Sequence, residues 1–560
     1  MTDLELAHSV TPRPILDIGR ELGIDPDELI PYGRHKAKVS LGLLDRLKDR
    51  PMGRYVLVTA INPTPLGEGK TTTSIGLAMG LTKLGHRTAV TLRQPSLGPV
   101  FGIKGGGTGG GHAQVIPMED INLHLTGDAH AVAASHNLLS AFLDNHLFQG
   151  NALSLDPSSI VWPRALGVSD RALRQVRLGD ETGNRVSQFV ITEASEVMAS
   201  LALALNQQDL RDRLGRMLVG FTKSGRPVTA QELGCAGSMA VLLRDAILPN
   251  LVQTLEGTPA FVHTGPFGNI AHGNCSVLSD AIALRCADFV VTEAGFGSDL
   301  GAEKFFNIKC RTSGFKPAAV VVVATLRALK LHGGGGLAKV GSPLPVGLTG
   351  PNHDALSKGF ANLEQHIANA KAHGVPVVVA VNAFKDDSRA ELDWVRDRSM
   401  EAGAIDAAVS THWSDGGKGA EQLAAAVVKA CEQPSRFTHL YELSWPIRTK
   451  IETIATKMYG AGSVTFEPEA ERQMERAEAL GFGRLPVCMA KTPLSLSHDP
   501  ALKGRPTGFI VPIKELRILA GAGFVTAVCS GIQLMPGLPK RPAGERIGLD
   551  PVNGQIVGLS

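Results

Sequence analysis

Short apolar runs recur along the chain, and each of them ends in a polar or glycine-rich loop. Continuous runs of valine, isoleucine, leucine and alanine are typical of strands that are buried on both faces of a sheet. We therefore predict a mostly parallel sheet that is covered by helices on both sides. The predicted strands cover residues 55–61, 88–92, 259–262, 289–291, 319–324 and 375–381.

Helical periodicity fills the segments between these runs. After the first predicted strand, Leu77, Leu81 and Leu84 are spaced i, i+4 and i+7, and Gly85 follows in the position of a C-terminal cap. This pattern predicts a helix over residues 71–84. Because strands and helices alternate, the fold class is expected to be α/β, with ligands at the carboxyl ends of the strands.

The loop between the first predicted strand and this helix has the residue types of a phosphate-binding loop (P-loop). In such loops backbone N–H groups at a helix start cradle phosphate oxygens, and a lysine reaches the β and γ phosphates. We predict that it binds a nucleoside triphosphate. A tight structural turn is the alternative, because Thr64 stands where a glycine is usual, but a buried turn needs no cation beside hydroxyl groups. The predicted nucleotide-binding residues are Thr64, Pro65, Leu66, Gly67, Glu68, Gly69, Lys70, Thr71 and Thr72.

Chain length and loop composition suggest how the sequence is divided. A chain of 560 residues is long enough for about two to four domains. Proline, glycine and charged residues are dense near residues 333–351 and 465–469. We predict a large P-loop-containing domain over residues 1–350 and two smaller α/β domains over 351–470 and 471–560.

Charge and cysteine usage narrow the kind of partner and the compartment. The net charge is only +3, with acidic and basic residues interspersed, which favours small-molecule ligands over nucleic acid or a membrane. The longest apolar run, near residues 318–326, is far shorter than the roughly 20 residues that span a bilayer. Seven cysteines, never spaced as CxxC, are typical of reduced thiols, so we expect a cytoplasmic protein.

Glycines are abundant and form clusters. Six of the 63 glycines fall within residues 105–111, where they offer little but backbone N–H groups and conformational freedom. A ligand-binding loop is the favoured interpretation, and a flexible surface loop is the alternative.

Longer segments around these motifs resemble the formate–tetrahydrofolate ligase family. Their order and spacing are similar to the family's from the first eighth of the chain to its end. The matching segments are TPLGEGKTT (64–72), LRQPSLGPVFGIKGGGTGGGHAQVIPMEDINLHLTGD (92–128), NLVQTLEGTPAFVHTGPFGNIAHGN (250–274), VVTEAGFGSDLGAEKFFNIKCR (290–311), VATLRALKLHGG (323–334) and MPGLPKRPA (535–543).

The resemblance implies an activity and its requirements. Formate, ATP and tetrahydrofolate would give 10-formyltetrahydrofolate, ADP and phosphate, with formyl phosphate as the intermediate. The family also implies a homotetramer, a magnesium nucleotide and stimulation by a monovalent cation, K⁺ or NH₄⁺. A fused dehydrogenase and cyclohydrolase partner would need hundreds of further residues, so we expect a monofunctional enzyme.

Two cations are the predicted catalytic centre. The carboxylate of formate and the γ-phosphate are both anionic, so fixed positive charge is needed between them. Lys70 is the first cation, and the Thr71 hydroxyl is the expected Mg²⁺ ligand. Arg93 follows a predicted strand; a structural salt bridge is the alternative there, but the resemblance places an arginine at the formyl phosphate.

A general base is predicted less directly. Residues 118–124 hold two carboxylic acids and an imidazole, and the N10 amine of folate must lose a proton during the attack. We choose His124 as the catalytic base, with Asp120 as the other candidate. A hydrogen-bonded brace within the loop is the alternative.

Two aromatic side chains are the predicted folate platform. Aromatic residues make up only 5% of the chain, and Phe384 and Trp413 lie in polar loops that follow apolar runs. Each could equally be a core residue on its own pattern. The resemblance implies that they are the pair on which the flat rings of folate stack.

The chain departs from the family's pattern at functional positions. Gln94 stands where a glutamate is common, which removes a carboxylate that bears on the monovalent cation. Lys385 replaces a common proline and adds a cation that could meet the glutamate tail of folate.

Two other functions fit part of the pattern. A nucleotide-switch ATPase would use the same loop, but it expects a second lysine early in it, and residues 64–66 supply none. A ligase that activates another small carboxylate is the second alternative.

Overall fold

A twelve-stranded sheet forms the centre of the molecule. The computed structural model describes the chain except for residues 66, 103–105, 181–182, 339–342, 530 and 560, and only the backbone of residues 180, 183 and 184. Seven neighbouring strands run parallel. In sheet order they are β14 (Pro259–Val262), β4 (Thr88–Leu92), β15 (Phe289–Glu293), β3 (Arg54–Ala60), β16 (Ala319–Ala324), β17 (Val377–Asn382) and β18 (Asp406–Ser410).

Antiparallel strands extend this sheet at one edge. They pair beyond β14, and none of them stood out as an apolar run in the sequence. They are β13 (Asn250–Thr254), β2 (Ala37–Val39), β1 (Leu29–Pro31), β6 (Ala113–Ile116) and β5 (Gly109–Gly110). The predicted α/β class and the mostly parallel sheet are confirmed.

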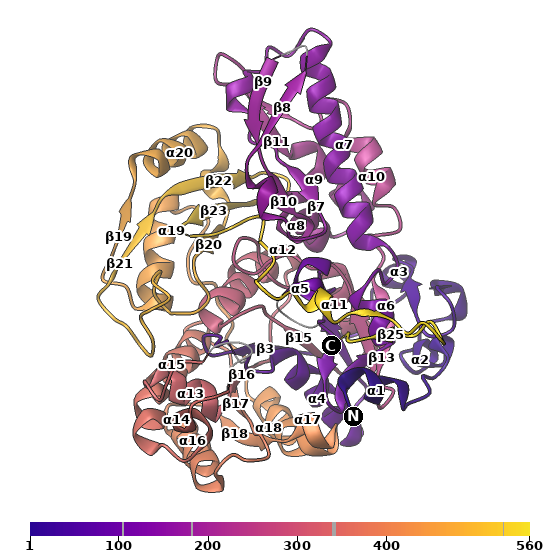
Figure 1. Ribbon diagram of the computed structural model, residues 1–560, viewed down its shortest axis with the longest axis vertical. Helices are drawn as coiled ribbons and strands as arrows, with labels where there is room; N and C mark the ends of the chain where they lie inside the picture. Colours follow the sequence, from indigo (N-terminus) through magenta and orange to yellow (C-terminus); the bar gives the residue numbers. More distant parts are fainter. Residues whose placement is uncertain (66, 103–105, 181–182, 339–342, 530, 560) are drawn as a thin grey trace.

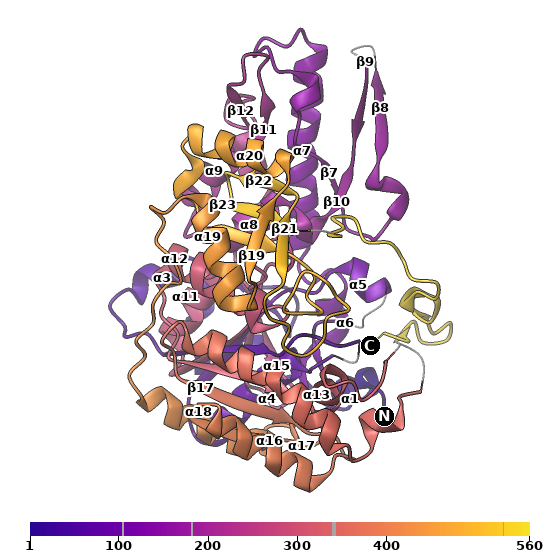
Figure 2. The same cartoon turned by 90° about the vertical axis from the view of Figure 1, so that its left-hand side faces the viewer.

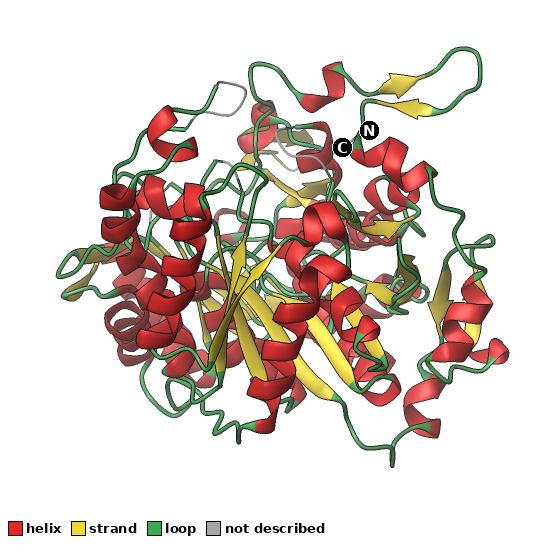
Figure 3. Cartoon of the chain, turned by 90° about the horizontal axis from the view of Figure 1, so that it is seen from below, coloured by secondary structure: helices red, strands yellow, loops and turns green. Residues whose placement is uncertain are grey.

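Helices cover both faces of the sheet, as Figure 3 shows from below. Side chains of β3 alternate: Tyr55 and Leu57 belong to the apolar core on one face, and Val56 and Val58 to the core on the other. Continuous apolar runs thus arise because both faces are buried. The first face is covered by α2 (Ile15–Glu21), α3 (Gly42–Arg46), α11 (Val277–Cys286), α13 (Leu326–His332), α15 (His353–Lys371) and α16 (Arg389–Glu401), and the second by α4 (Lys70–Lys83), α6 (Met118–Asn122) and α18 (Glu421–Glu432).

A second part, residues 128–248, has its own apolar core beside the sheet (Figures 1 and 2). Its hairpin β8–β9 projects away from the rest, which Figure 2 shows most clearly. Its elements are α7 (Asp128–Phe148), β7 (Arg164–Leu166), β8 (Val176–Asp180), β9 (Gly183–Ser187), β10 (Phe189–Ile191), α8 (Glu196–Leu203), α9 (Gln207–Arg216), β11 (Leu218–Phe221), β12 (Pro227–Thr229) and α10 (Ala236–Leu242).

The C-terminal part, residues 440–529, forms a third core. Its elements are α19 (Ile447–Ile454), β19 (Ser463–Phe466), α20 (Pro468–Ala479), β20 (Val487–Ala490), β21 (Ile510–Ile513), β22 (Glu515–Leu519) and β23 (Phe524–Val528). After it the chain returns to the N-terminus through β24 (Gly548–Leu549) and β25 (Ile556–Val557), and Leu559 joins Leu4 and Ala7 in a small apolar cluster (Figure 1). The short helices α1 (Asp3–His8), α5 (Leu97–Phe101), α12 (Cys310–Ser313), α14 (Val346–Thr349) and α17 (His412–Asp415) lie in loops.

The central sheet continues across residue 350. Strand β17 pairs in parallel with β16, and β18 pairs in parallel with β17, so this position is not a break in the sheet. The division into three domains stays a prediction. Within the described chain, no helix has both the length and the apolar character that crossing a membrane would require.

Candidate active site

The loop after β3 turns sharply into α4. Gly69 precedes the helix with φ of +76°, a conformation that favours glycine. A Cβ on Gly69 would also lie 2.5 Å from Nδ2 of Asn382, the last residue of β17. The neighbouring strand end therefore holds the loop against the helix start.

A buried carboxylate lies beneath this loop. Glu68 is 1% exposed, and its Oε1 accepts the backbone N–H of Thr64 at 2.6 Å. Its Oε2 is 3.8 Å from Nζ of Lys70. Pro65 and Gly67 are exposed at the tip of the loop.

Of the other predicted nucleotide-binding residues, Thr71 and Thr72 lie in the first turn of α4 and are half-buried. Leu66 lies outside the described residues. The predicted strand, turn and helix are therefore present, with the lysine at the first position of the helix.

Glu293 connects this loop to Arg93. Thr71 Oγ1 donates to Glu293 Oε2 at 2.6 Å, and Arg93 Nε lies 3.5 Å from Glu293 Oε1. Glu293 ends β15, which lies between β3 and β4, the strands that precede Thr71 and Arg93. The structure thus brings Lys70, Thr71 and Arg93 to one edge of the sheet.

A buried polar cluster lies around Arg93. In the part of the chain that the structure describes, many of its buried side-chain atoms have no hydrogen-bond partner. Unsatisfied buried polar groups cost about 1–3 kcal/mol each unless a ligand or water bonds to them. The atoms are Arg93 Nε, Gln94 Oε1, Ser96 Oγ, Thr192 Oγ1, Glu193 Oε2, Thr264 Oγ1, both ring nitrogens of His272 and both amide atoms of Asn274.

Close backbone approaches hold this cluster together. The N–H of Gln94 donates to Thr264 O at 2.6 Å, and a Cβ on Gly265 would lie 2.6 Å from Gln94 O. A Cβ on Gly295 would lie 3.0 Å from Arg93 Nη1. A side chain at position 265 would press on the backbone of Gln94, and one at position 295 would press on the guanidinium of Arg93.

Two groups of the cluster have shifted proton affinities. Burial raises the pKa of Glu193 to about 7, so this carboxyl exchanges a proton near neutrality. Burial, reinforced by Lys309 and other nearby cations including Arg93, lowers the pKa of His272 well below its usual value. The imidazole of His272 is therefore neutral, with one ring nitrogen able to donate and the other able to accept a hydrogen bond.

The two predicted folate platforms follow paired strand ends. Asn382 of β17 is opposite Ser410 of β18, so Phe384 and Trp413 lie at the same edge of the sheet as Lys70. The guanidinium of Arg327 lies 4.1 Å from the Phe384 ring centre. Trp413 is 54% exposed, which is unusual for so large an apolar ring.

The turn that carries Trp413 is anchored on α4. A Cβ on Gly76 would lie 2.4 Å from the Cβ of His412, and His412 Nε2 is 3.3 Å from Thr73 Oγ1. The backbone O of Trp413 accepts the N–H of His112, which follows the glycine-rich segment. Trp413 is thus fixed between α4 and that segment, of which residues 103–105 lie outside the described residues.

His124 lies apart from these groups. It is exposed, and its Nδ1 is 2.8 Å from His130 Nε2. The alternative base, Asp120, makes an ion pair with Lys36 at 2.9 Å. Among the described residues, no hydrogen bond joins either group to Arg93 or Lys70, and the catalytic role of His124 stays a prediction.

Sequence reasoning missed three residues of this site. Glu293 follows the predicted strand 289–291, and this position just after an apolar run was a usable signal. No sequence pattern pointed to Glu193 or His272, because neither residue belongs to a recognisable motif. Their importance comes from burial next to Arg93.

Comparison with known proteins identifies the family. The family model described as formate–tetrahydrofolate ligase matches residues 1–560. The chain belongs to the formate–tetrahydrofolate ligase family. It is 55% identical to a formate–tetrahydrofolate ligase of Roseiflexus sp. (strain RS-1) over 564 residues, which cover 100% of both chains. Proteins of the same name from Saccharopolyspora erythraea and Desulforamulus reducens are 56% and 53% identical, over 100% of this chain and 99% of each relative. The resemblance seen in the sequence is therefore confirmed.

A magnesium nucleotide would need oxygen ligands near the start of α4. The described residues contain no group of three or more His, Cys, Asp or Glu side chains that could hold a metal ion. Thr71 Oγ1 and Glu293 Oε2 are nevertheless adjacent oxygens at the start of α4. Mg²⁺ takes one or two such protein ligands and completes its shell with phosphate and water oxygens, so these two atoms fit a magnesium nucleotide.

Proposed function

We propose that this chain joins formate to tetrahydrofolate through formyl phosphate, with the 61–69 loop and the Arg93 cluster as its reaction centre. The ATP-dependent ligation itself follows from membership of the formate–tetrahydrofolate ligase family. The site assignment rests on one observation, the contact of both Thr71 and Arg93 with Glu293. Glu293 thus contacts both the candidate triphosphate loop and the Arg93 cluster, which is the candidate site for formate.

Electrostatics explain why both cations are needed. Two like unit charges about 4 Å apart repel by about 4 kcal/mol at an effective dielectric of about 20. Lys70 would neutralise the phosphate oxygens, and the planar fork of Arg93 suits a carboxylate or acyl phosphate. The uncharged donors of Asn274 and the acceptors around it would hold a small acid in a fixed orientation.

The reaction balances in two transfers. A formate oxygen attacks the γ-phosphorus, the bond to the ADP oxygen breaks, and ADP leaves. The N10 amine of tetrahydrofolate then attacks the formyl carbon, and phosphate leaves with that former formate oxygen and the bonding electron pair. The amine proton passes to a base, the role predicted for His124.

Cations assist the first transfer. The side-chain oxygens of Thr71 and Glu293 would hold Mg²⁺, and the ion would supply charge neutralisation of the phosphates. The uncharged oxygens of Gln94 and Thr264 would hold K⁺ or NH₄⁺ more weakly than a carboxylate. A half-maximal K⁺ concentration above that of relatives with glutamate at position 94 would support this assignment.

Folate would lie between Phe384 and Trp413, whose loops follow paired strand ends. Lys385, exposed next to Phe384, offers a cation to the glutamate tail. We further propose a homotetramer in the cytoplasm; the seven cysteines, all buried and free, are compatible with a reducing compartment.

Isotope transfer tests the proposed route. With [¹⁸O]formate, ATP and tetrahydrofolate, one ¹⁸O should appear in each inorganic phosphate released, and ADP formation should need both formate and folate. ADP release without formate, and inorganic phosphate that contains no ¹⁸O, would favour a nucleotide switch. Equal turnover with acetate would favour a broader carboxylate ligase.

A further inference from the structure

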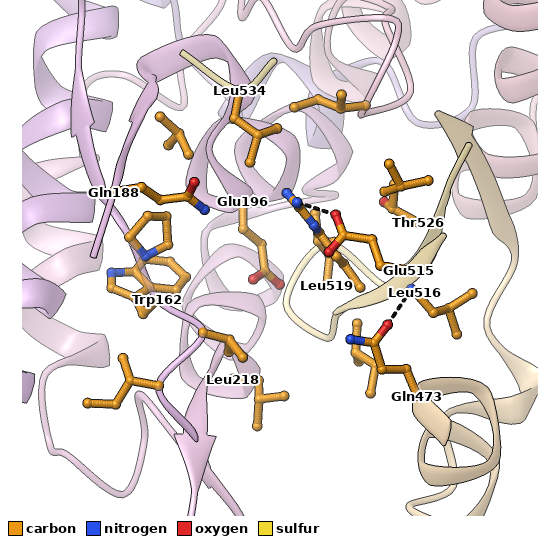
Figure 4. A pocket seen from close by; sticks show the side chains of 18 of the residues that line it. Trp162, Gln188, Glu196, Leu218, Gln473, Glu515, Leu516, Leu519, Thr526 and Leu534 are labelled. Carbon is orange, nitrogen blue, oxygen red and sulfur yellow. Dashed lines mark hydrogen bonds and ion pairs between the residues drawn. The ribbon is translucent and has the colours of Figure 1, made fainter. Parts of the chain in front are cut away.

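A cavity of about 500 Å³ separates the second part from the C-terminal part. Its walls come from β10, β11 and α8 on one side and from α20, β22 and β23 on the other (Figure 4). This volume lies within the usual range for small-molecule sites, about 300–1,000 Å³. The Lys70 loop, Phe384 and Trp413 do not line it.

The cavity lining combines apolar side chains with polar and charged ones. Aliphatic and aromatic side chains line both sides; the ring of Trp162 stacks on His136, and that of Phe221 lies against the guanidinium of Arg476. The other large apolar contributors include Leu218, Leu516, Leu519 and Leu534. These apolar side chains favour a ligand with a flat or branched hydrocarbon body over a strongly hydrated one.

Glu196 is a carboxylate within this mixed lining. Its Oε1 accepts the backbone N–H groups of Gly521 at 2.7 Å and Ala522 at 3.2 Å. Figure 4 shows its side chain in the space between the two walls. No ion pair involving Glu196 occurs among the described residues, and burial raises its pKa to about 7.

The other carboxylates of the cavity are paired with arginines, and one lining arginine packs on an aromatic ring. Glu515 is paired with Arg517, and Glu469 with Arg472 outside the lining. The guanidinium of Arg476 lies 3.3 Å from the Phe221 ring centre. Among the lining carboxylates of the described structure, Glu196 is the one without an ion pair. A cationic ligand would supply that partner.

His136 contributes a neutral ring to the lining. Its Nε2 is 2.9 Å from Pro163 O and must carry the proton, which leaves Nδ1 as the acceptor. Nδ1 is buried without a partner among the described residues. Burial lowers the pKa of His136 to about 4, so the ring stays neutral at physiological pH.

The cavity is also close to the Arg93 cluster along the chain. Glu193 of the cluster and Glu196 of the cavity are three residues apart, and their connection is the turn before α8. Ile270 lines the cavity, and His272 belongs to the cluster. Two short segments are therefore shared by both sites.

We propose that this cavity binds a flat aromatic or heteroaromatic cation with an amidine-type N–H edge, anchored by Glu196, and that its occupancy alters formate use. The ring matches the apolar side chains of the lining, and paired N–H donors match a carboxylate in a bidentate geometry. An anion would meet Glu196 with like charge, and a neutral ring would leave it unpaired. The link to formate use rests on the proposed role of the Arg93 cluster.

Calorimetry with the full-length protein tests the binding, with benzamidine as the probe. Benzamidine should bind at least about tenfold more tightly than benzamide, its neutral isostere, or benzoate. Because the cation prefers the carboxylate form of Glu196, benzamidine affinity should rise about tenfold per pH unit below pH 7 and level off above it. Equal affinity for benzamide would overturn the proposal.

Matched variants locate the probe. Glu196→Gln keeps the acceptor for Gly521 and Ala522 and should weaken benzamidine at least about tenfold, whereas Glu515→Gln, at a carboxylate already paired, should change it less than about threefold. Val161→Trp should block the cavity at a side chain that is 56% exposed and therefore tolerant. Undiminished binding in folded Glu196→Gln and Val161→Trp proteins would place the probe elsewhere.

Kinetics test the link to formate. Saturating benzamidine should change the KM for formate by at least about threefold, leave the KM for ATP within twofold, and have no effect in Glu196→Gln. An unchanged formate KM would refute the link, and the calorimetric result would stand by itself. Failure of the ¹⁸O transfer with intact benzamidine binding would instead refute the proposed function.

Discussion

Two buried glutamates at the sheet edge, Glu293 and Glu193, differ in their hydrogen-bond partners. Glu293 is 4% exposed and has two partners, whereas Glu193, at 2%, has an oxygen with none among the described residues. The first acts as a fixed brace between Thr71 and Arg93. The second is a group whose charge changes near neutrality, so its effect on stability depends on pH.

Lys70 is the residue on which phosphate chemistry should depend most. Lys70→Ala should lower ADP formation by about 10²–10³-fold, because an organised charge at the reacting phosphate is lost. Tetrahydrofolate binding, measured by calorimetry, should remain. Lys429→Ala, at an exposed lysine paired with Asp406, is the control and should keep full activity. Normal ADP formation by Lys70→Ala would exclude the loop from the reaction.

Glu193 should make the fold less stable as pH rises. Its pKa is about 7 in the folded protein and 4.5 ordinarily, so the folded state binds more protons between these values. The contribution of Glu193 to the free energy of unfolding is fully present below about pH 4.5. It falls by up to about 3 kcal/mol as pH rises to about 7 and beyond. Glu193→Gln should flatten the pH dependence of thermal unfolding over this range, and Glu475→Gln, at an exposed site, should not.

Trp413 should contribute to folate binding rather than to folding. Trp413→Ala should weaken the binding of tetrahydrofolate by about 1–3 kcal/mol, which is roughly 5- to 150-fold in affinity. The melting temperature should change little, because the ring is 54% exposed. Trp445→Ala, in the C-terminal part, is the matched control. A folate affinity that both variants leave unchanged would refute the platform.

Among the elements, α4 links the two candidate binding sites. Its first residue is Lys70, and glycines further along it lie against the chain near Trp413. A Cβ at Gly76 would meet His412, and one at Gly80 would lie 2.9 Å from Ala420 O. Helix α4 therefore sets the distance between the triphosphate loop and the turn α17.

Gly76→Ala tests this spacing. The added methyl group should push α17 away, cost about 1–3 kcal/mol of stability, and raise the folate KM more than the ATP KM. Gly237→Ala in α10 is the control, since a Cβ there would meet nothing within 4 Å. That change should be neutral or stabilising by up to about 1 kcal/mol. An unchanged folate KM in Gly76→Ala would show that the spacing between α4 and α17 does not affect folate binding.

At the scale of the whole molecule, a buried ion pair joins the C-terminal part to the sheet. Lys491 Nζ lies 2.7 Å from Asp299 Oδ2, and both side chains are fully buried. Asn62, which follows β3, donates from its side chain to Asp299 and to Pro493 O. The C-terminal part is thus fixed near the loop that leads to Lys70.

Removing one partner of this pair should destabilise the molecule strongly. Lys491→Met would leave the Asp299 charge buried and unpaired, at a cost of about 3–5 kcal/mol. Combining it with Asp299→Leu should recover most of that loss in a thermal unfolding experiment. Lys358→Met, at a pair with Asp354 that is largely exposed, should cost less than about 1 kcal/mol. A double variant as unstable as Lys491→Met would show that the charge itself is not the cause.

The central sheet was predictable from the sequence because each parallel strand is buried on both faces, which produces a local run of apolar residues. Residues 88–92, 259–262 and 319–324 were predicted with the observed bounds of β4, β14 and β16. The turn at Gly69 and the lysine after it are also local features. The antiparallel edge and the small sheets lack such runs and were not predicted.

Only the tertiary structure decided which side chains share a site. Thr71, Arg93 and Glu293 are far apart along the chain and meet because β3, β15 and β4 are neighbours in the sheet. Trp413 and Phe384 share an edge for the same reason, and His124 lies on the surface despite its promising sequence neighbours. Local patterning reports burial and backbone conformation, whereas proximity depends on strand order, which single segments do not encode.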